Sequence, residues 1–122
     1  MKLLNITSAL FTRSRRLNPQ DCAERVRNGD AVLIDIREAS EWEHGVAEGA
    51  VPLSFRDFVS ARAQWKPFLA TVGDRELLFY CAAGVRAGIA ARMLAREGFR
   101  TANTGSLSDW RSAGWPIVKP RI

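Results

Sequence analysis

Two short, nearly continuous apolar runs, AVLIDI at residues 31–36 and ELLFY at residues 76–80, constrain the fold of this chain most. Runs of this length and type are typical of strands that are buried on both faces of a parallel sheet. Longer stretches with helical spacing of apolar residues follow each of them, at 54–69 and 85–98. Strands that alternate with helices in this way predict an α/β fold, with a parallel sheet and helices on both faces.

Capping residues set the expected limits of the helices. A first helix is expected over residues 18–29, with Asn18 as N-cap, Pro19 at the first helical position and Gly29 at its end. The helix over 85–98 ends at a glycine in the same way. Its core candidates are Ile89, Ala90, Met93 and Leu94.

A single helix is expected over residues 54–69, with Ser54 as its N-cap. Two further segments, 38–45 and 106–114, fit short helices or turns, and residues 100–103 fit a short strand. The core candidates on the 54–69 helix are Phe55, Phe58, Val59 and Trp65.

The chain has the size and composition of one domain with a hydrophobic core: 122 residues, 47% apolar and 25% charged. Its net charge of +5 is interpreted mainly as a solvated basic surface. The arginine-rich pieces lack interleaved aromatic residues and any known module motif, so no nucleic-acid binding is predicted. Two cysteines and one histidine fit neither a disulfide framework nor a metal site, and they favour a reducing compartment.

Residues 1–16 are interpreted as an N-terminal extension before a domain at 17–122. The apolar part of this extension is short and interrupted by polar residues, and its arginines follow that part, whereas a signal peptide has the opposite order. No stretch approaches the roughly 20 apolar residues of a membrane span. The sequence therefore predicts a cytoplasmic protein without a membrane partner, and leaves open whether the extension is an amphipathic helix or a tail.

Polar and nucleophilic residues stand at the ends of both predicted buried strands. Cys81 follows ELLFY. Asp35 lies near the end of AVLIDI, and Arg37 directly follows it. In a parallel α/β sheet, ligands bind beyond the carboxyl ends of the strands. The sequence therefore predicts a functional site that contains these three residues.

The six residues CAAGVR, from Cys81 to Arg86, lead directly into the predicted helix 85–98. A loop that curls around the sulfur would point its backbone N–H groups inward, as an anion cradle at a helix N-terminus. Its alanines leave room for close approach, and Gly84 permits a positive φ. Helix N-termini and nearby cations lower the pKa of a thiol, so Cys81 is predicted to be a thiolate and a nucleophile. The alternative of an inert buried cysteine is less consistent with this loop.

Three segments resemble the rhodanese-like sulfurtransferase family. CAAGVRA is similar to its CxxGxR[AS] active-site loop, VLIDIREASEWEHGVAEGA to its VLIDVRxxxE[FY]xxGHIxGA segment, and GSLSDWRSAGWPIV to its C-terminal GGxxxWxxxGxPV. The resemblance covers about residues 17–120. It implies a mostly parallel, five-stranded sheet flanked by helices.

The resemblance also implies an activity: sulfane-sulfur transfer through a persulfide on Cys81. The donor would be a small anion such as thiosulfate, or a protein persulfide, and the acceptor would be cyanide or a thiol. No metal or organic cofactor is implied, since the persulfide is the carrier. Asp35 and Arg37 would support the loop rather than take part in the chemistry. The implied substrate-binding residues are Ala82, Ala83, Gly84, Val85 and Arg86.

The chain departs from the family pattern at two places. Val46 stands where the family usually has histidine, which affects the expected local packing, and Ser106 replaces the second glycine of the GG pair. His44 is interpreted as a surface residue. Cys22 is interpreted as structural, although a resolving role beside Cys81 stays open from the sequence.

Two other functions are alternatives to sulfur transfer. A phosphatase or arsenate reductase of related fold needs a Cys-x5-Arg loop, one residue longer than this one, and a tyrosine precedes Cys81 where those enzymes usually have histidine. A non-catalytic or relay module that accepts persulfide from a protein partner remains the main alternative.

Overall fold

The computed structural model describes residues 15–120. The prediction of a helix or tail over residues 1–16 lies almost wholly outside the described residues. Arg15 and Arg16 are described, and they run beside the last strand of the sheet, where the backbone N–H of Asn103 donates to the carbonyl of Arg15 over 2.8 Å. These two residues therefore pack against the edge of the sheet.

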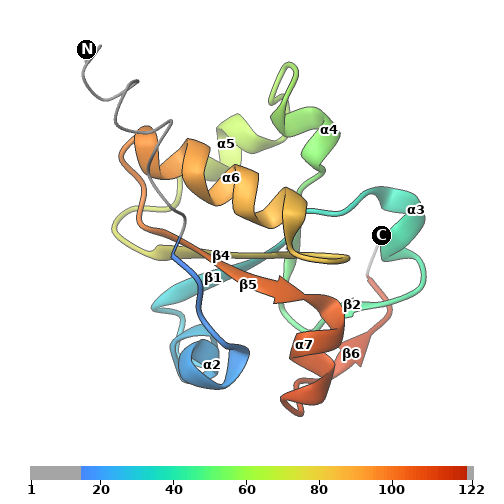
Figure 1. Ribbon diagram of the computed structural model, residues 1–122. Helices are drawn as coiled ribbons and strands as arrows, with labels where there is room; N and C mark the ends of the chain where they lie inside the picture. Colours follow the sequence, from blue (N-terminus) through green and yellow to red (C-terminus); the bar gives the residue numbers. More distant parts are fainter. Residues whose placement is uncertain (1–14, 121–122) are drawn as a thin grey trace.

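A parallel sheet of four strands forms the centre of the molecule: β1 (Ala31–Asp35), β3 (Val51–Pro52), β4 (Glu76–Cys81) and β5 (Thr101–Ser106). Their order in the sheet is β3-β1-β4-β5, and Figure 1 labels β1, β4 and β5. Its central pair, β1 and β4, is in register from Ala31 with Glu76 to Asp35 with Tyr80. Beyond β5, Arg16 forms one parallel bridge with Asn103, so a fifth strand is present only as this single pair in the described chain. The predicted parallel α/β architecture is confirmed.

Helices cover both faces of the sheet (Figure 1). One face carries α4 (Phe55–Phe58), α5 (Trp65–Leu69) and α6 (Val85–Arg96), and the other carries α2 (Pro19–Arg27) and α7 (Leu107–Ser112). The short helix α3 (Ala39–Trp42) follows β1, and an antiparallel pair, β2 (Val46–Ala47) and β6 (Ile117–Val118), lies apart from the main sheet. Each face has its own buried core, because successive side chains of a strand point to opposite faces.

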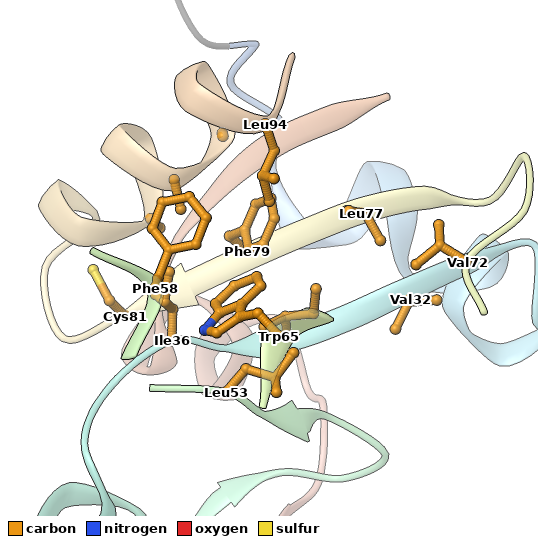
Figure 2. Close-up of a cluster of buried hydrophobic side chains, with 14 residues drawn as sticks. Val32, Ile36, Leu53, Phe58, Trp65, Val72, Leu77, Phe79, Cys81 and Leu94 are labelled. Carbon is orange, nitrogen blue, oxygen red and sulfur yellow. The ribbon is translucent and has the colours of Figure 1, made fainter. Parts of the chain in front are cut away.

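The alternation is clearest along β4. Leu77, Phe79 and Cys81 lie in the core beneath α4, α5 and α6, which Figure 2 shows in close-up. Leu78 and Tyr80 lie in the opposite core, with Cys22, Trp110 and Trp115. The strand therefore delivers the side chain of Cys81 to the α6 face.

The prediction of one helix over residues 54–69 is wrong. Ser54 does cap α4, since its Oγ accepts from the N–H of Asp57 over 3.0 Å, but the helix ends at Phe58. The carboxylate of Asp57 then accepts from the N–H groups of Ala63 and Gln64, each over 2.9 Å, which turns the chain before α5. Val59, a predicted core residue, is consequently 55% exposed.

The two departures from the family pattern fit the local structure. Val46 is buried in β2 opposite Val118. Ser106 has a φ of −117°, an ordinary extended value, and caps α7 in a capping box with Asp109. Of the two residues at the family's GG pair, only Gly105 has a positive φ, of 92°. In the part of the chain that the structure describes, no helix is long and apolar enough to cross a membrane.

Candidate functional site

Cys81 is the last residue of β4, at the carboxyl edge of the sheet, and is 1% exposed. Its side chain lies in the same buried cluster as Phe58 and Ile36, and Figure 2 shows these two side chains beside it. The strand fixes the direction of the thiol, and the apolar neighbours limit its movement. Its sulfur therefore lies between this apolar cluster and the loop that follows.

The loop after Cys81 curls back onto the sulfur, as predicted. The backbone N–H of Gly84 donates to Sγ of Cys81 over 3.0 Å. Gly84 makes this contact with φ 91° and ψ −8°, in the left-handed region that glycine adopts without strain. The helix α6 begins at the next residue, and the N–H groups of its first turn have no partners within the helix. The sulfur therefore lies at the positive end of a helix of 12 residues.

Asn103 holds Gly84 in this position, and the sequence analysis missed it. Its Nδ2 donates to the carbonyl of Gly84 over 3.0 Å, and its Oδ1 accepts from the N–H of Gly105 over 2.9 Å. Asn103 is buried in β5, the strand next to β4. A single side chain thus ties the cysteine loop to the neighbouring strand.

Arg86 joins the loop to α3, the helix that follows β1. Its Nη1 and Nη2 donate to the two carboxylate oxygens of Glu41 in α3, over 2.7 and 2.9 Å. These hydrogen bonds to Arg86 lower the pKa of Glu41 to about 2, so Glu41 is ionised at neutral pH. Glu41 is the second residue that sequence analysis missed; its only signal was the acidic position in the family-like segment, to which no role was assigned.

Asp35 and Arg37 form a buried ion pair at the end of β1. Nε and Nη2 of Arg37 donate to the carboxylate of Asp35, and Nη2 also donates to the carbonyl of Gly45 over 2.7 Å. Trp42 of α3 donates from Nε1 to the same carboxylate over 3.2 Å. The pair therefore anchors α3 and the segment that follows it.

Tyr80 connects this pair to the strand that carries Cys81. Its hydroxyl donates to Oδ2 of Asp35 over 2.5 Å and accepts from the N–H of Ala47 over 2.9 Å. Burial, followed by the charge of Asp35, raises the pKa of Tyr80 well above its ordinary value, so the phenol stays protonated. The contacts that the structure gives for Asp35 and Arg37 reach the cysteine loop through Tyr80 and α3, not by direct bonds to residues 82–86.

Cys22 is far from this arrangement in the fold. It is fully buried in α2 and belongs to the core on the opposite face of the sheet from Cys81. Burial raises the pKa of its thiol to about 11. The sheet separates the two sulfurs, so Cys22 has no access to Cys81 in the folded protein. His44 is exposed, as predicted.

The site has no visible arrangement for a metal. Across residues 15–120, no group of three or more His, Cys, Asp or Glu side chains is placed to hold an ion. What the geometry offers is one buried sulfur, an amide hydrogen bond to it, a helix N-terminus and a paired arginine.

Comparison with known proteins agrees with this architecture. In the solved structures, a rhodanese-related protein from Thermoplasma volcanium superposes with a TM-score of 0.72 at 23% identity, over 87% of this chain and 99% of that one. The thiosulfate:glutathione sulfurtransferase of Saccharomyces cerevisiae is 31% identical over 94 residues, covering 70% of this chain and 68% of the yeast protein.

Other relatives have a different activity in their names. The tRNA uridine(34) hydroxylase of Acinetobacter baumannii is 27% identical over 84 residues, which are 69% of this chain and 27% of that protein. The chain thus spans only about a quarter of the length of these hydroxylases. The family model described as "Rhodanese-like domain" matches residues 18–113. The chain belongs to the rhodanese-like family, which includes sulfurtransferases.

Proposed function

We propose that this protein is a sulfurtransferase that carries sulfane sulfur as a persulfide on Cys81. The observation that carries the proposal is the 3.0 Å hydrogen bond from the N–H of Gly84 to Sγ, made at the N-terminus of α6. An amide donor and the helix dipole both stabilise negative charge on the sulfur, as thiolate before transfer and as persulfide after it. The yeast relative's name, thiosulfate:glutathione sulfurtransferase, supports the same chemistry.

The reaction proceeds by double displacement. The Cys81 thiolate attacks the outer sulfur of a donor, the S–S bond of the donor breaks, and its electron pair leaves with the remainder, as sulfite when the donor is thiosulfate. The enzyme persulfide then gives its terminal sulfur to cyanide or to a thiol, which restores the thiolate. Residues 82–86 supply backbone N–H groups to the departing anion and to the charged persulfide, and the covalent persulfide takes the place of a cofactor.

The supporting residues have defined tasks in this scheme. Asn103 holds the carbonyl of Gly84 and so restrains the backbone of the residue whose N–H faces the sulfur. Asp35, Arg37 and Tyr80 hold the end of β1 against the end of β4. Rigid support of this kind keeps the amide donors aimed at the position where charge develops.

The test is the intact mass of the protein after incubation with thiosulfate or with a small-molecule persulfide. The expected result is a gain of one sulfur atom, lost on addition of cyanide, in the wild type and in a Cys22→Ser variant but not in Cys81→Ser. Cys22 is the matched control because it is the other buried free cysteine and lies on the opposite face of the sheet. No mass gain from either donor, or a gain that survives in Cys81→Ser, would reject the proposal. A gain only in the presence of a desulfurase partner would favour a sulfur-relay module over an independent enzyme.

A further inference from the structure

The guanidinium of Arg86, the cation of the cysteine loop, is already paired with a carboxylate. Both terminal nitrogens of Arg86 donate to Glu41, and the carboxylate of Glu41 stays ionised down to about pH 2. A bidentate pair of this geometry directs the guanidinium toward the carboxylate and cancels most of its charge at a distance. A second anion that approaches Arg86 therefore meets an ion pair rather than a free positive charge.

Residues 82–85 of the loop add no polar side chain. Ala82, Ala83 and Val85 are exposed, and the valine side chain is 69% exposed. Val59, at the end of the neighbouring helix α4, is 55% exposed. These residues can contact an apolar carrier, but they offer no donor to the oxygens of a small oxyanion.

Two other arginines of the described chain, Arg37 and Arg16, bear on the charge near the loop. Arg37 is buried and paired with Asp35. Arg16 lies on the β5 side of the loop, and its Nη1 is 3.2 Å from the position that a Cβ on Gly84 would take. Its guanidinium is therefore next to the backbone of Gly84. The charge of Arg16 is the same in the wild type and in any Glu41 variant. It therefore does not contribute to a difference between their rates of Cys81 loading.

We infer that Glu41 determines the charge selectivity of the site, and that the sulfur donor is a persulfide on a thiol carrier of low charge rather than the dianion thiosulfate. This inference rests on the proposed function. In the loading step the Cys81 thiolate attacks the terminal sulfur of R–S–SH, the donor S–S bond breaks, and R–S⁻ leaves with the electron pair. The proton then redistributes between the enzyme persulfide and the released thiol. No oxidant or reductant is consumed.

The test compares two donors in three proteins. The donors are thiosulfate and the persulfide of N-acetylcysteine amide, whose carrier has no charge of its own. The proteins are the wild type, Glu41→Gln and Glu43→Gln, and the second-order rate of Cys81 loading is followed by intact mass. The Oε1 of glutamine can still accept from the N–H of Glu38 and from Nη1 of Arg86, while the bond from Nη2 is lost. Glu41→Gln therefore removes the charge with little change in side-chain size. Glu43→Gln is the matched control, because it changes the net charge equally on an exposed residue next to α3 without touching Arg86.

The two donors differ in intrinsic reactivity, so the decisive quantity is the change in their rate ratio. In Glu41→Gln the ratio of the thiosulfate rate to the persulfide rate is expected to rise about five- to tenfold, the effect of roughly one unit charge near a protein surface. The thiosulfate reaction of this variant should also slow as KCl is raised. In Glu43→Gln the ratio should stay at the wild-type value.

Two outcomes would overturn the inference. A ratio unchanged in Glu41→Gln would show that the loop does not select by charge, and an equal rise in Glu43→Gln would assign the effect to net charge alone. Both differ from failure of the proposed function, in which the wild type gains sulfur from neither donor.

Discussion

The hydrogen bond to the sulfur of Cys81 depends on one residue outside its loop. Gly84 donates to Sγ, and the peptide that follows Gly84 is held at its carbonyl by Asn103. The carbonyl of Gly84 also accepts from the N–H of Gly88, so without Asn103 it keeps one donor, and the lost hydrogen bond costs about 0.5–1.5 kcal/mol. The freed loop can then turn its amides away from the sulfur. Asn103 therefore acts as a positioning residue.

We predict that Asn103→Leu lowers the first-order rate of Cys81 sulfur loading at saturating donor by about tenfold, the value of one hydrogen bond of about 1.4 kcal/mol. The donor concentration at half-maximal rate should change less than the maximal rate. The matched control is Thr101→Val, which removes a buried 2.7 Å hydrogen bond from the same strand to Ala91, away from the loop. Stopped-flow loading and urea unfolding should show similar stability losses in both variants but slow loading only in Asn103→Leu. Equal loading rates in the two variants would contradict the assignment.

The sequence predicted the residues that follow the buried strands and missed those that approach from elsewhere. Cys81, Asp35 and Arg37 could be placed together because the carboxyl ends of parallel strands meet at one edge of the sheet. Glu41 contacts a residue 45 positions away, and Asn103 contacts one 19 positions away. No local pattern encodes these contacts, since they depend on how α3 and β5 pack beside the loop.

At the scale of single elements, the start of α6 sets the geometry of the site. Gly84, its N-cap, has φ 91°, and Gly98, just after its other end, has φ 101°. An alanine in either place is forced into a conformation that costs about 1–2 kcal/mol. A Cβ on Gly98 meets no atom within 4 Å, whereas one on Gly84 approaches the flexible end of Arg16. The two glycines therefore form a matched pair with similar strain and different positions.

We predict that Gly84→Ala and Gly98→Ala destabilise the protein by similar amounts, about 1–2 kcal/mol in urea unfolding. Only Gly84→Ala should slow sulfur loading, because relaxation of its φ turns the N–H away from Sγ. Intact-mass kinetics on both variants provide the measurement. Loading slowed as strongly by Gly98→Ala would mean that the strand and helix, not the direction of this amide, control the reaction.

Helices and strands with strong local sequence signals were predicted correctly, and those without such signals were missed. The runs that became β1 and β4, and the capped helices α2 and α6, carry strong local signals and were predicted correctly. The split between α4 and α5 was missed because the side chain of Asp57 replaces the helical partners of Ala63 and Gln64. The strands β2, β3 and β6 have two residues each, too few to show any periodicity.

Across the whole molecule, the Arg86–Glu41 pair links the loop after β4 to the helix after β1. The pair joins two elements that are separated in the chain, and both partners are about a quarter to a third exposed. Water therefore screens part of the attraction, and its contribution to stability is smaller than that of a buried pair. Protonation of the partly exposed Glu41 in acid would nevertheless weaken this contact without protonating any buried group.

Acid should weaken this link in a defined range of pH. Hydrogen bonds from Arg86 lower the pKa of Glu41 from 4.5 to about 2 in the folded protein. A carboxyl group whose folded pKa is depressed stabilises the fold above its unfolded pKa, and this stabilisation is lost as the pH falls through the folded value. The free energy of unfolding of the wild type, relative to Glu41→Gln, should therefore be constant above about pH 5 and fall steadily toward pH 2. Urea unfolding of both proteins at a series of pH values measures this difference, with Glu43→Gln controlling for net charge. A difference that stays constant down to pH 2 would show that the ion pair does not persist in solution, and would remove the physical basis for charge selectivity at the cysteine loop.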